Sequence, residues 1–239
     1  MKRRSAELIA RDPERFFHHD RVFLNNPVVM QGMGLAPLVV LATNGQNALM
    51  LAAAVALLLT PSRLLACLLS RLFPLREEHP SKAELEKKLL PRSILYSGSA
   101  AVVYLAAYPI LNRLFGVSLL VLGIYLPMLV VEPLLTYRFG RVQESPRKAL
   151  SKGVRITVGY SLLLLLLGCV REWLSAGTVF GHLLSRPILP MAGMPAGGFI
   201  VLGVVCAVWR ALARKHKEYL KTEARGTLAA HPRKEVQDQ

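Results

Sequence analysis

The lysines and arginines of this 239-residue chain are grouped in every second gap between its charge-poor apolar stretches. Of the 30 Lys and Arg, 27 lie in four groups: six in residues 1–27, seven in 63–92, six in 138–155 and eight from residue 210 onward. Only Arg113, Arg171 and Arg186 fall in the other gaps. Because cytoplasmic loops of membrane proteins collect Lys and Arg while translocated loops do not, this alternation predicts six spans with both termini in the cytoplasm.

The composition excludes two broad classes of protein. The chain is 53% hydrophobic and 19% charged, whereas about 25% of the residues of a soluble domain are charged. The net charge of +15 does not indicate a nucleic-acid partner, because such domains interleave basic and aromatic residues on one face. We therefore predict an all-α integral membrane protein of the cell (inner or plasma) membrane, in contact with lipid.

The apolar stretches divide into six predicted transmembrane helices, at about 26–42, 48–69, 93–111, 117–137, 154–173 and 188–209. Residues 22–62 carry no charge and are too long for one crossing, which takes about 20 residues. We place a turn at residues 43–47. A cytoplasmic basic segment, 1–25, precedes the membrane domain of residues 26–209, and a basic cytoplasmic tail, 210–239, follows it and is expected to begin as a helix.

Three connections between the spans are also predicted. Ser81 and Glu84 resemble a capping box, which predicts a short surface helix in the cytoplasmic loop 70–92. Residues 112–116 are expected to form a tight external connection. A longer external loop contains Gly177 and Gly181.

The first and fourth spans are predicted to be interrupted helices. Span 26–42 contains Gly32, Gly34 and Pro37, and span 117–137 contains Pro127, Glu132 and Pro133. The two spans share a pattern, Leu-Ala-Pro-Leu-Val-Val at 35–40 and Leu-Pro-Met-Leu-Val-Val at 126–131. Each opens a group of three spans, and because three is odd the second group enters from the opposite face. This arrangement predicts two inverted three-helix repeats with a site at the midplane. The alternative, that the two spans are ordinary kinked helices, stays open.

Glu132 is the candidate ion or proton site. An intramembrane carboxylate is costly and by default indicates a proton carrier or cation ligand, and Pro133 frees a backbone carbonyl beside it. Glu132 is also close enough to Arg138 to snorkel or to pair with it, and both interpretations stay open. Arg171 and Glu172, adjacent in the sequence, are interpreted as a membrane-edge ion pair or a subunit contact, with a structural role.

The chain resembles the RnfE/NqrD family, membrane subunits of the Rnf and Na⁺-translocating NADH:quinone oxidoreductase complexes, from about residue 25 to 209. The motifs that carry the resemblance are Asn26-Pro27-Val28 to Gln31, Gly34-Leu35-Ala36-Pro37-Leu38, Asn47-Ala48-Leu49, Gly123-Ile124-Tyr125-Leu126-Pro127, Leu167-Gly168-Cys169-Val170-Arg171-Glu172, Gly177-Thr178-Val179-Phe180 and Met194-Pro195-Ala196-Gly197-Gly198-Phe199-Ile200. The resemblance implies a six-span inverted repeat. This agrees with the six spans predicted from the distribution of the basic residues.

The resemblance also implies a chemistry from which this chain departs. Members carry one cysteine in each interrupted span and share an intramembrane [2Fe-2S] cluster with a homologous RnfA/NqrE-like subunit. Here those two positions are Ala36 and Pro133, which offer no thiolate or imidazole to iron. Cys67, Cys169 and Cys206 lie in other spans and are interpreted as small apolar residues. No cluster and no metal site is therefore expected.

The resemblance makes the chain an integral-membrane component of an Rnf/Nqr-type electron-transport complex that is not catalytic alone. The partners expected are the homologous membrane subunit and the other subunits of such a complex. With Ala36 and Pro133 at the cluster positions, we expect a structural or redox-inactive role. Two alternatives remain open: a paralogous small transporter or ion-conducting protein that uses Glu132, and a non-redox scaffold for the homologous partner.

Overall fold

The computed structural model describes residues 3–32, 34–70, 82–123, 125–126 and 145–230, and most of them are helical. Four long helices dominate: α5 (Gly45–Ser70), α6 (Lys82–Phe115), α10 (Pro146–Ala176) and α11 (Pro195–Ala230). Each contains a stretch that is long and apolar enough to cross a bilayer, since about 20 residues suffice. The predicted helical membrane fold is thus confirmed at this level. Of the predicted spans, 48–69, 93–111, 154–173 and 188–209 correspond to these helices.

The four helices differ from the predicted spans chiefly at their basic ends. Helix α6 already begins at Lys82, α10 begins at Pro146, and α11 continues to Ala230. The surface helix predicted in 70–92 is therefore the first part of α6 and not a separate element, and the basic residues of 146–155 are helical and not in a loop. Lys and Arg are good helix formers, so a helix need not end where the apolar stretch does.

Two predicted boundaries at the other ends of the helices, the end of α6 and the start of α11, are also corrected. Helix α6 continues through Phe115, so 112–115 are its last turn, and it ends at Gly116, whose φ of 54° suits a residue without a Cβ. The sixth span begins at Pro195, because residues 190–193 form the 3₁₀ turn η2 (Pro190–Gly193). Proline at each start is pre-set for the first helical position.

The first predicted span is interrupted, as expected, but at two glycines and not at its proline. It consists of α3 (Pro27–Gln31) and α4 (Leu35–Leu41). Gly32 and Gly34 have φ of 67° and 72°, the left-handed region that favours glycine. Pro37 lies inside the first turn of α4, where its missing N–H would have no intrahelical acceptor.

Part of the fourth predicted span is described. After η1 (Gly116–Ser118), α7 (Leu119–Leu122) ends at Gly123, whose φ is 44°. Residues 127–144, and with them Pro127, Glu132 and Pro133, lie outside the described residues. The six spans and the inverted repeat therefore stay predictions.

The loop after α10, which is predicted to be external, contains a small antiparallel ribbon that the all-α prediction omitted. Strands β1 (Thr178–Val179) and β2 (His182–Leu183) pair with Thr178 opposite Leu183. The turn between them places Phe180 and Gly181 at φ of 51° and 80°, the pair of positive angles of a type I′ hairpin turn.

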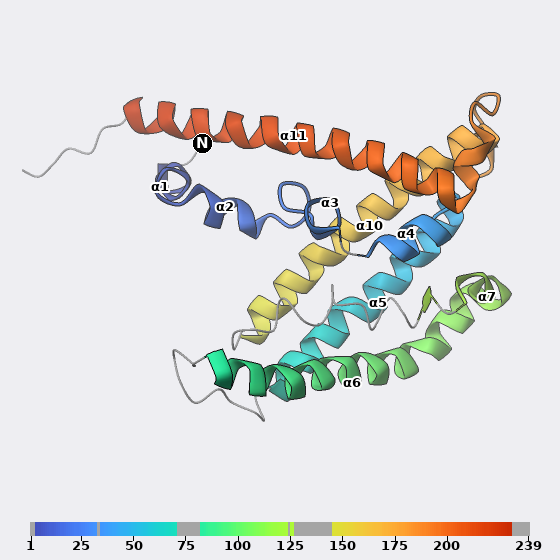
Figure 1. Cartoon of the computed structure of the whole chain (residues 1–239), viewed down its shortest axis with the longest axis horizontal. Coiled ribbons are helices and arrows are strands. Elements are labelled where there is room, and N and C mark those ends of the chain that lie inside the picture. Colours follow the sequence, from blue (N-terminus) through green and yellow to red (C-terminus); the bar gives the residue numbers. More distant parts are fainter. Residues whose placement is uncertain (1–2, 33, 71–81, 124, 127–144, 231–239) are drawn as a thin grey trace, which may run out of the picture.

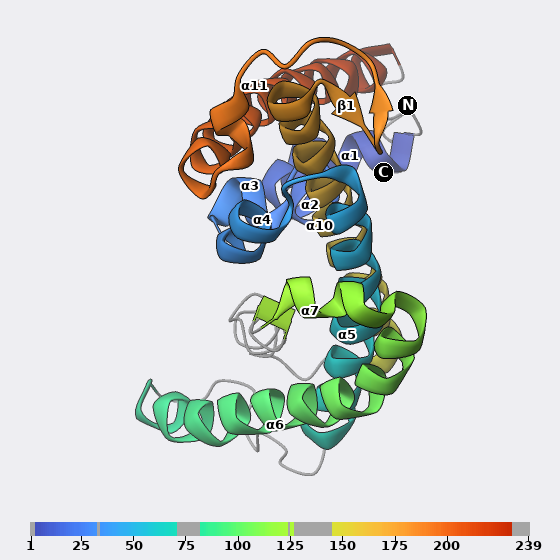
Figure 2. The ribbon, with the colours of Figure 1, turned by 90° about the vertical axis from the view of Figure 1, so that its right-hand side faces the viewer.

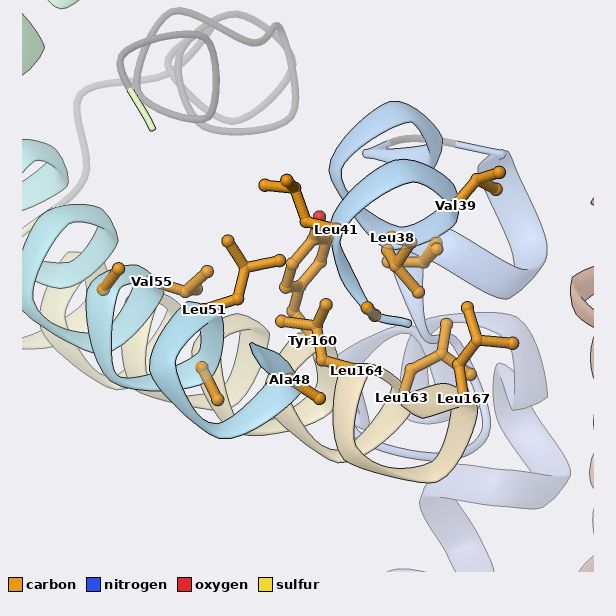
Figure 3. Packing of buried hydrophobic residues seen from close by; sticks show 14 of the residues in the cluster. Leu38, Val39, Leu41, Ala48, Leu51, Val55, Tyr160, Leu163, Leu164 and Leu167 are labelled. Atoms are coloured by element: carbon orange, nitrogen blue, oxygen red, sulfur yellow. The ribbon is translucent and has the colours of Figure 1, made fainter. Parts of the chain in front are cut away.

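Helices α5 and α10 run side by side and form the centre of the molecule, with α11 and α6 on opposite sides of the pair (Figures 1 and 2). Side chains of α4, α5 and α10 point into a shared core, in which Leu38, Leu51 and Leu163 are fully buried (Figure 3). A Cβ on Gly168 would lie 2.6 Å from that of Ala48. Small residues thus let α5 and α10 approach closely, as in membrane helix pairs.

The ends of the long helices that adjoin basic residues lie on one side of the molecule. The starts of α6 and α10, the end of α11 and the N-terminal helices α1 (Arg3–Arg11) and α2 (Pro13–His19) all lie toward the left in Figure 1. The opposite ends, with the β-ribbon, lie toward the right. Helices α6 and α10 therefore run in one direction and α5 and α11 in the other, as the alternation of the basic groups predicts.

Candidate functional site

The candidate site is the interrupted segment formed by α3 and α4, at the position where the sequence predicts a midplane site. Asn26 starts it: its Oδ1 accepts a hydrogen bond of 3.0 Å from the Val28 N–H, the usual capping geometry. Its Nδ2 donates to the carbonyls of Val22 and Gly159 at 3.1 and 2.9 Å. Asn26 is fully buried, so these bonds tie the start of α3 to α10.

The break itself is held by a tyrosine. The Tyr160 hydroxyl donates to the Gly34 carbonyl at 2.9 Å. A Cβ on Gly34 would lie only 2.6 Å from the Tyr160 ring. Glycine at 34 is therefore required twice, for its positive φ and for the close contact with α10.

Two arginines bind the carbonyl ends of the two short helices. Arg171 Nη1, from α10, donates to the carbonyls of Val39 and Ala42, at 2.6 and 2.9 Å, at the end of α4. Arg210 Nε, from α11, donates to the Val29 carbonyl in the last turn of α3 at 2.8 Å. The last carbonyls of a helix carry partial negative charge and lack intrahelical donors, so a guanidinium there is doubly favourable.

Arg171 also binds a second segment. Its Nε donates to the Ala192 carbonyl at 2.9 Å, and its Nη2 donates to those of Gly193 and Met194, both at 3.2 Å. The side chain is fully buried, and a Cβ on Gly198 would lie 2.8 Å from the guanidinium carbon. One cation therefore joins α10, α4 and η2.

Glu172, the next residue, binds donors on the other side of α10. Its carboxylate accepts from the N–H groups of Gly45, Phe180 and Gly181 at 2.8, 3.1 and 2.8 Å, and from the Thr178 hydroxyl at 3.0 Å. It thereby joins the start of α5 to the β-ribbon. Carboxylates favour a helix N-terminus because the unbonded N–H groups there are partly positive.

The structural role expected of Arg171 and Glu172 is confirmed, but they are neither an ion pair with each other nor a subunit contact. Both side chains are buried within this chain, and each binds its own set of backbone groups. Arg171 could have been singled out because it breaks the alternation of basic residues. Asn26 was visible only as the first residue of the Asn26-Pro27-Val28 motif, and Tyr160 left no signal in the sequence.

Of the sequence-predicted site residues, only Ala36 is described. It lies in the first turn of α4, is half-buried and presents a methyl group. Glu132 and Pro133 fall outside the described residues. Among the residues that the structure does describe, no three His, Cys, Asp or Glu side chains gather as in a metal site. Cys67, Cys169 and Cys206 lie on α5, α10 and α11 and are not part of the interrupted segment.

Comparison with known proteins gives a consistent result. Residues 16–206 match the family described as Rnf-Nqr subunit, membrane protein. The E subunit of the ion-translocating oxidoreductase complex of Shewanella baltica strain OS185 is 29% identical over 216 residues, covering 81% of this chain and 85% of the relative. The proteins of the same name from Shewanella sp. strain W3-18-1 and Shewanella oneidensis are each 28% identical, over 82% and 81% of this chain and 86% and 85% of theirs.

Proposed function

We propose, because this chain belongs to the Rnf-Nqr family of membrane subunits, that it is a multi-pass component of an ion-translocating oxidoreductase complex. The family match, together with four apolar helices long enough to span a bilayer, makes the chain a multi-pass membrane protein. Its proposed place is the plasma membrane with both termini in the cytoplasm. The gathering of the basic helix ends on one side supports that orientation (Figure 1).

Within the complex, the chain is proposed to be redox-inactive. The resemblance places the family's cluster ligands at Ala36 and Pro133, and neither side chain has a donor atom for iron. The residues present at these positions do not fit a [2Fe-2S] cluster. The proposed role is accordingly structural: a membrane subunit, not catalytic alone, that holds a homologous RnfA/NqrE-like partner and, with it, the other subunits.

The observation that carries the structural role is the way the interrupted segment is held. Tyr160 and Arg171 of α10 and Arg210 of α11 bind its backbone, and Asn26 at its start donates to the Gly159 carbonyl of α10. These bonds hold the start of α3, the break and the carbonyl ends of both short helices. The segment therefore has a defined shape that does not depend on ligands to a metal, which is what a scaffold for a homologous partner requires.

The redox-inactive role predicts the iron content of the purified pair. Isolated with its homologous membrane partner and reduced with dithionite, the protein is expected to show no [2Fe-2S] electron paramagnetic resonance signal. The measurement is accompanied by iron analysis. A family member that retains both cysteines, purified with its own partner in the same way, is the positive control. A stoichiometric cluster signal from the pair described here would disprove the proposal.

A second function is supported by Glu132 alone. It is the one charged residue between Arg113 and Arg138, and a carboxylate inside an apolar span is a candidate ion or proton carrier. The alternative proposal is a small transporter or ion-conducting protein that uses Glu132.

The test of this second function is Glu132→Gln. In proteoliposomes with an imposed sodium or pH gradient, the variant is expected to lose most of the ion flux of the wild type, because glutamine cannot carry a proton or a formal charge. Lys215→Gln, an exposed change on α11, is the control for reconstitution. Flux that is unchanged in Glu132→Gln would exclude the transport role.

A further inference from the structure

Helix α11 continues well past the end of its membrane-spanning part. The sixth predicted span ends at Trp209, and the helix runs on to Ala230, a further length of about 30 Å at 1.5 Å per residue. In Figure 1 it reaches farther to the left than any other described helix. The family match ends at residue 206, so this extension is not part of the region shared with the family.

The extension is a folded unit with the N-terminus. Residues 210–230 belong to α11, which confirms the helical start of the predicted tail. Ala6, Ile9, Phe17 and Leu24 form a small buried cluster with Ala224 of this helix. The Trp209 indole donates to the Phe23 carbonyl at 3.0 Å. Helix α1 also precedes the matched region. The N-terminal helices therefore pack on the extension and leave its other faces to form a surface.

Five cations form a stripe along this extension, which we call the basic stripe: Arg210, Arg214, Lys217, Lys221 and Arg225. Their spacing of four, three, four and four residues places them on one side of a helix. Arg214, Lys221 and Arg225 are exposed. Lys217 is half-buried, with its Nζ 5.9 Å from the centre of the Phe17 ring.

The stripe is unfavourable for the isolated helix. Lys217 and Lys221, and then Lys221 and Arg225, are like charges four residues apart, a spacing that destabilises a helix. Glu218 adjoins the stripe and offsets one charge, while Glu223 lies on another face of α11. A row of cations with so little acidic compensation on its own helix points to an anionic occupant.

Lipid headgroups reach only the beginning of the stripe. Arg225 lies about 22 Å along the helix from Arg210, and even a tilt of 40° leaves about 17 Å along the membrane normal. The headgroup layer on one side of a bilayer is about 5–8 Å thick, and charges farther than about 8 Å apart are largely screened at physiological salt. The distal cations therefore face water or protein.

We infer that the basic stripe docks an acidic face of a soluble protein on the side of the membrane that holds both termini. The face that fits carries several carboxylates spread over about 20 Å, matching the rise between Arg210 and Arg225. Exposed cations of this kind contribute chiefly to association rate and to partner choice. The binding is accordingly salt-dependent.

The test uses the full chain in nanodiscs of zwitterionic lipid and, as probe, a fluorescent glutamate-rich peptide of about 20 residues, which spans about 30 Å as a helix. Replacing Arg214, Lys221 and Arg225 with glutamine is expected to weaken peptide binding by about tenfold, because three exposed charge pairs are lost. Fluorescence anisotropy at two salt concentrations measures the change.

A control variant with the same change in charge separates the stripe from net charge. Leu212→Glu, Lys215→Gln and Gly226→Glu together also lower the net charge by three, at exposed positions of α11 that are neither three nor four residues from any cation of the stripe. This variant is expected to bind within about twofold of the wild type. Equal weakening in both variants, or binding unaffected by either, would overturn the proposal.

A further experiment tests whether anionic lipid headgroups, and not a protein, occupy the basic stripe. The wild type is also placed in nanodiscs containing anionic phospholipid, with the same peptide. If the stripe is occupied by headgroups, these nanodiscs abolish peptide binding, and the docking of a protein face is disproved. Retained binding in both lipids supports the docking surface, and an unchanged melting temperature of each variant shows that the helix unit is intact.

Discussion

Replacing Arg171 with methionine is expected to lower the free energy of unfolding by about 3 kcal/mol, which corresponds to a fall in melting temperature of about 10 °C in detergent for a chain of this size. Methionine fills much of the same volume but donates no hydrogen bond. The carbonyls of Val39, Ala42 and Ala192 then lose the guanidinium that binds them, and buried acceptors without donors are costly.

The position of the effect is as informative as its size. Hydrogen exchange should increase in α4 and around η2, which Arg171 joins, and remain unchanged in α3, whose end is bound by Arg210. Arg171→Lys should recover only part of the stability, because a single ammonium cannot reach carbonyls on both segments as the guanidinium fork does.

The matched control for Arg171 is Arg113→Met on α6. Arg113 is another arginine in an apolar helix, but it is exposed, and its replacement is expected to change the melting temperature by less than about 2 °C. If Arg171→Met were as mild as Arg113→Met, the buried guanidinium would not be what holds α4 in place.

Replacing Glu172 with alanine is expected to cost about 2 kcal/mol, because a buried carboxylate is removed from three N–H groups and a hydroxyl. The start of α5 and the β-ribbon should then separate. Hydrogen exchange at Gly45, Phe180 and Gly181 measures this directly, and thermal unfolding gives the overall loss.

Two further variants show what Glu172 contributes. Glu172→Gln keeps one acceptor oxygen but turns an amide NH₂ toward N–H donors, so it is expected to recover less than half of the loss. Glu218→Ala, on the exposed side of α11, is the matched control and should leave the ribbon unchanged. Faster exchange of Gly45 in both alanine variants would contradict a specific role for Glu172.

The break in the first span could be predicted from the sequence, but the side chains that bind its backbone could not. Gly32 and Gly34 are visible as helix breakers in an apolar stretch, and both adopt the left-handed conformation that glycine permits. The groups that hold the break come from far along the chain: Tyr160 binds Gly34 across 126 residues, and Arg171 binds Val39 across 132. No local pattern encodes such a distance.

In the fourth span, the sequence predicts a site that the described residues do not include. The sequence singles out Glu132 and Pro133, but neither is among the described residues, so their roles rest on chemistry alone. In the same way, the inverted repeat follows from basic groups and a shared six-residue pattern. The orientation of α5, α6, α10 and α11 agrees with it in Figure 1 without testing the repeat itself.

The sequence by itself determined the membrane class, the four long helices and the side on which their basic ends gather. It could do so because hydrophobicity and charge act on each segment separately through the solvent around it. Only the tertiary structure decided that Arg171 binds the carbonyl end of α4 and that Glu172 binds the start of α5. The same is true of the packing of the N-terminal helices on the end of α11. Those outcomes depend on which buried donors and acceptors meet, and that is set by the packing of segments distant in the chain.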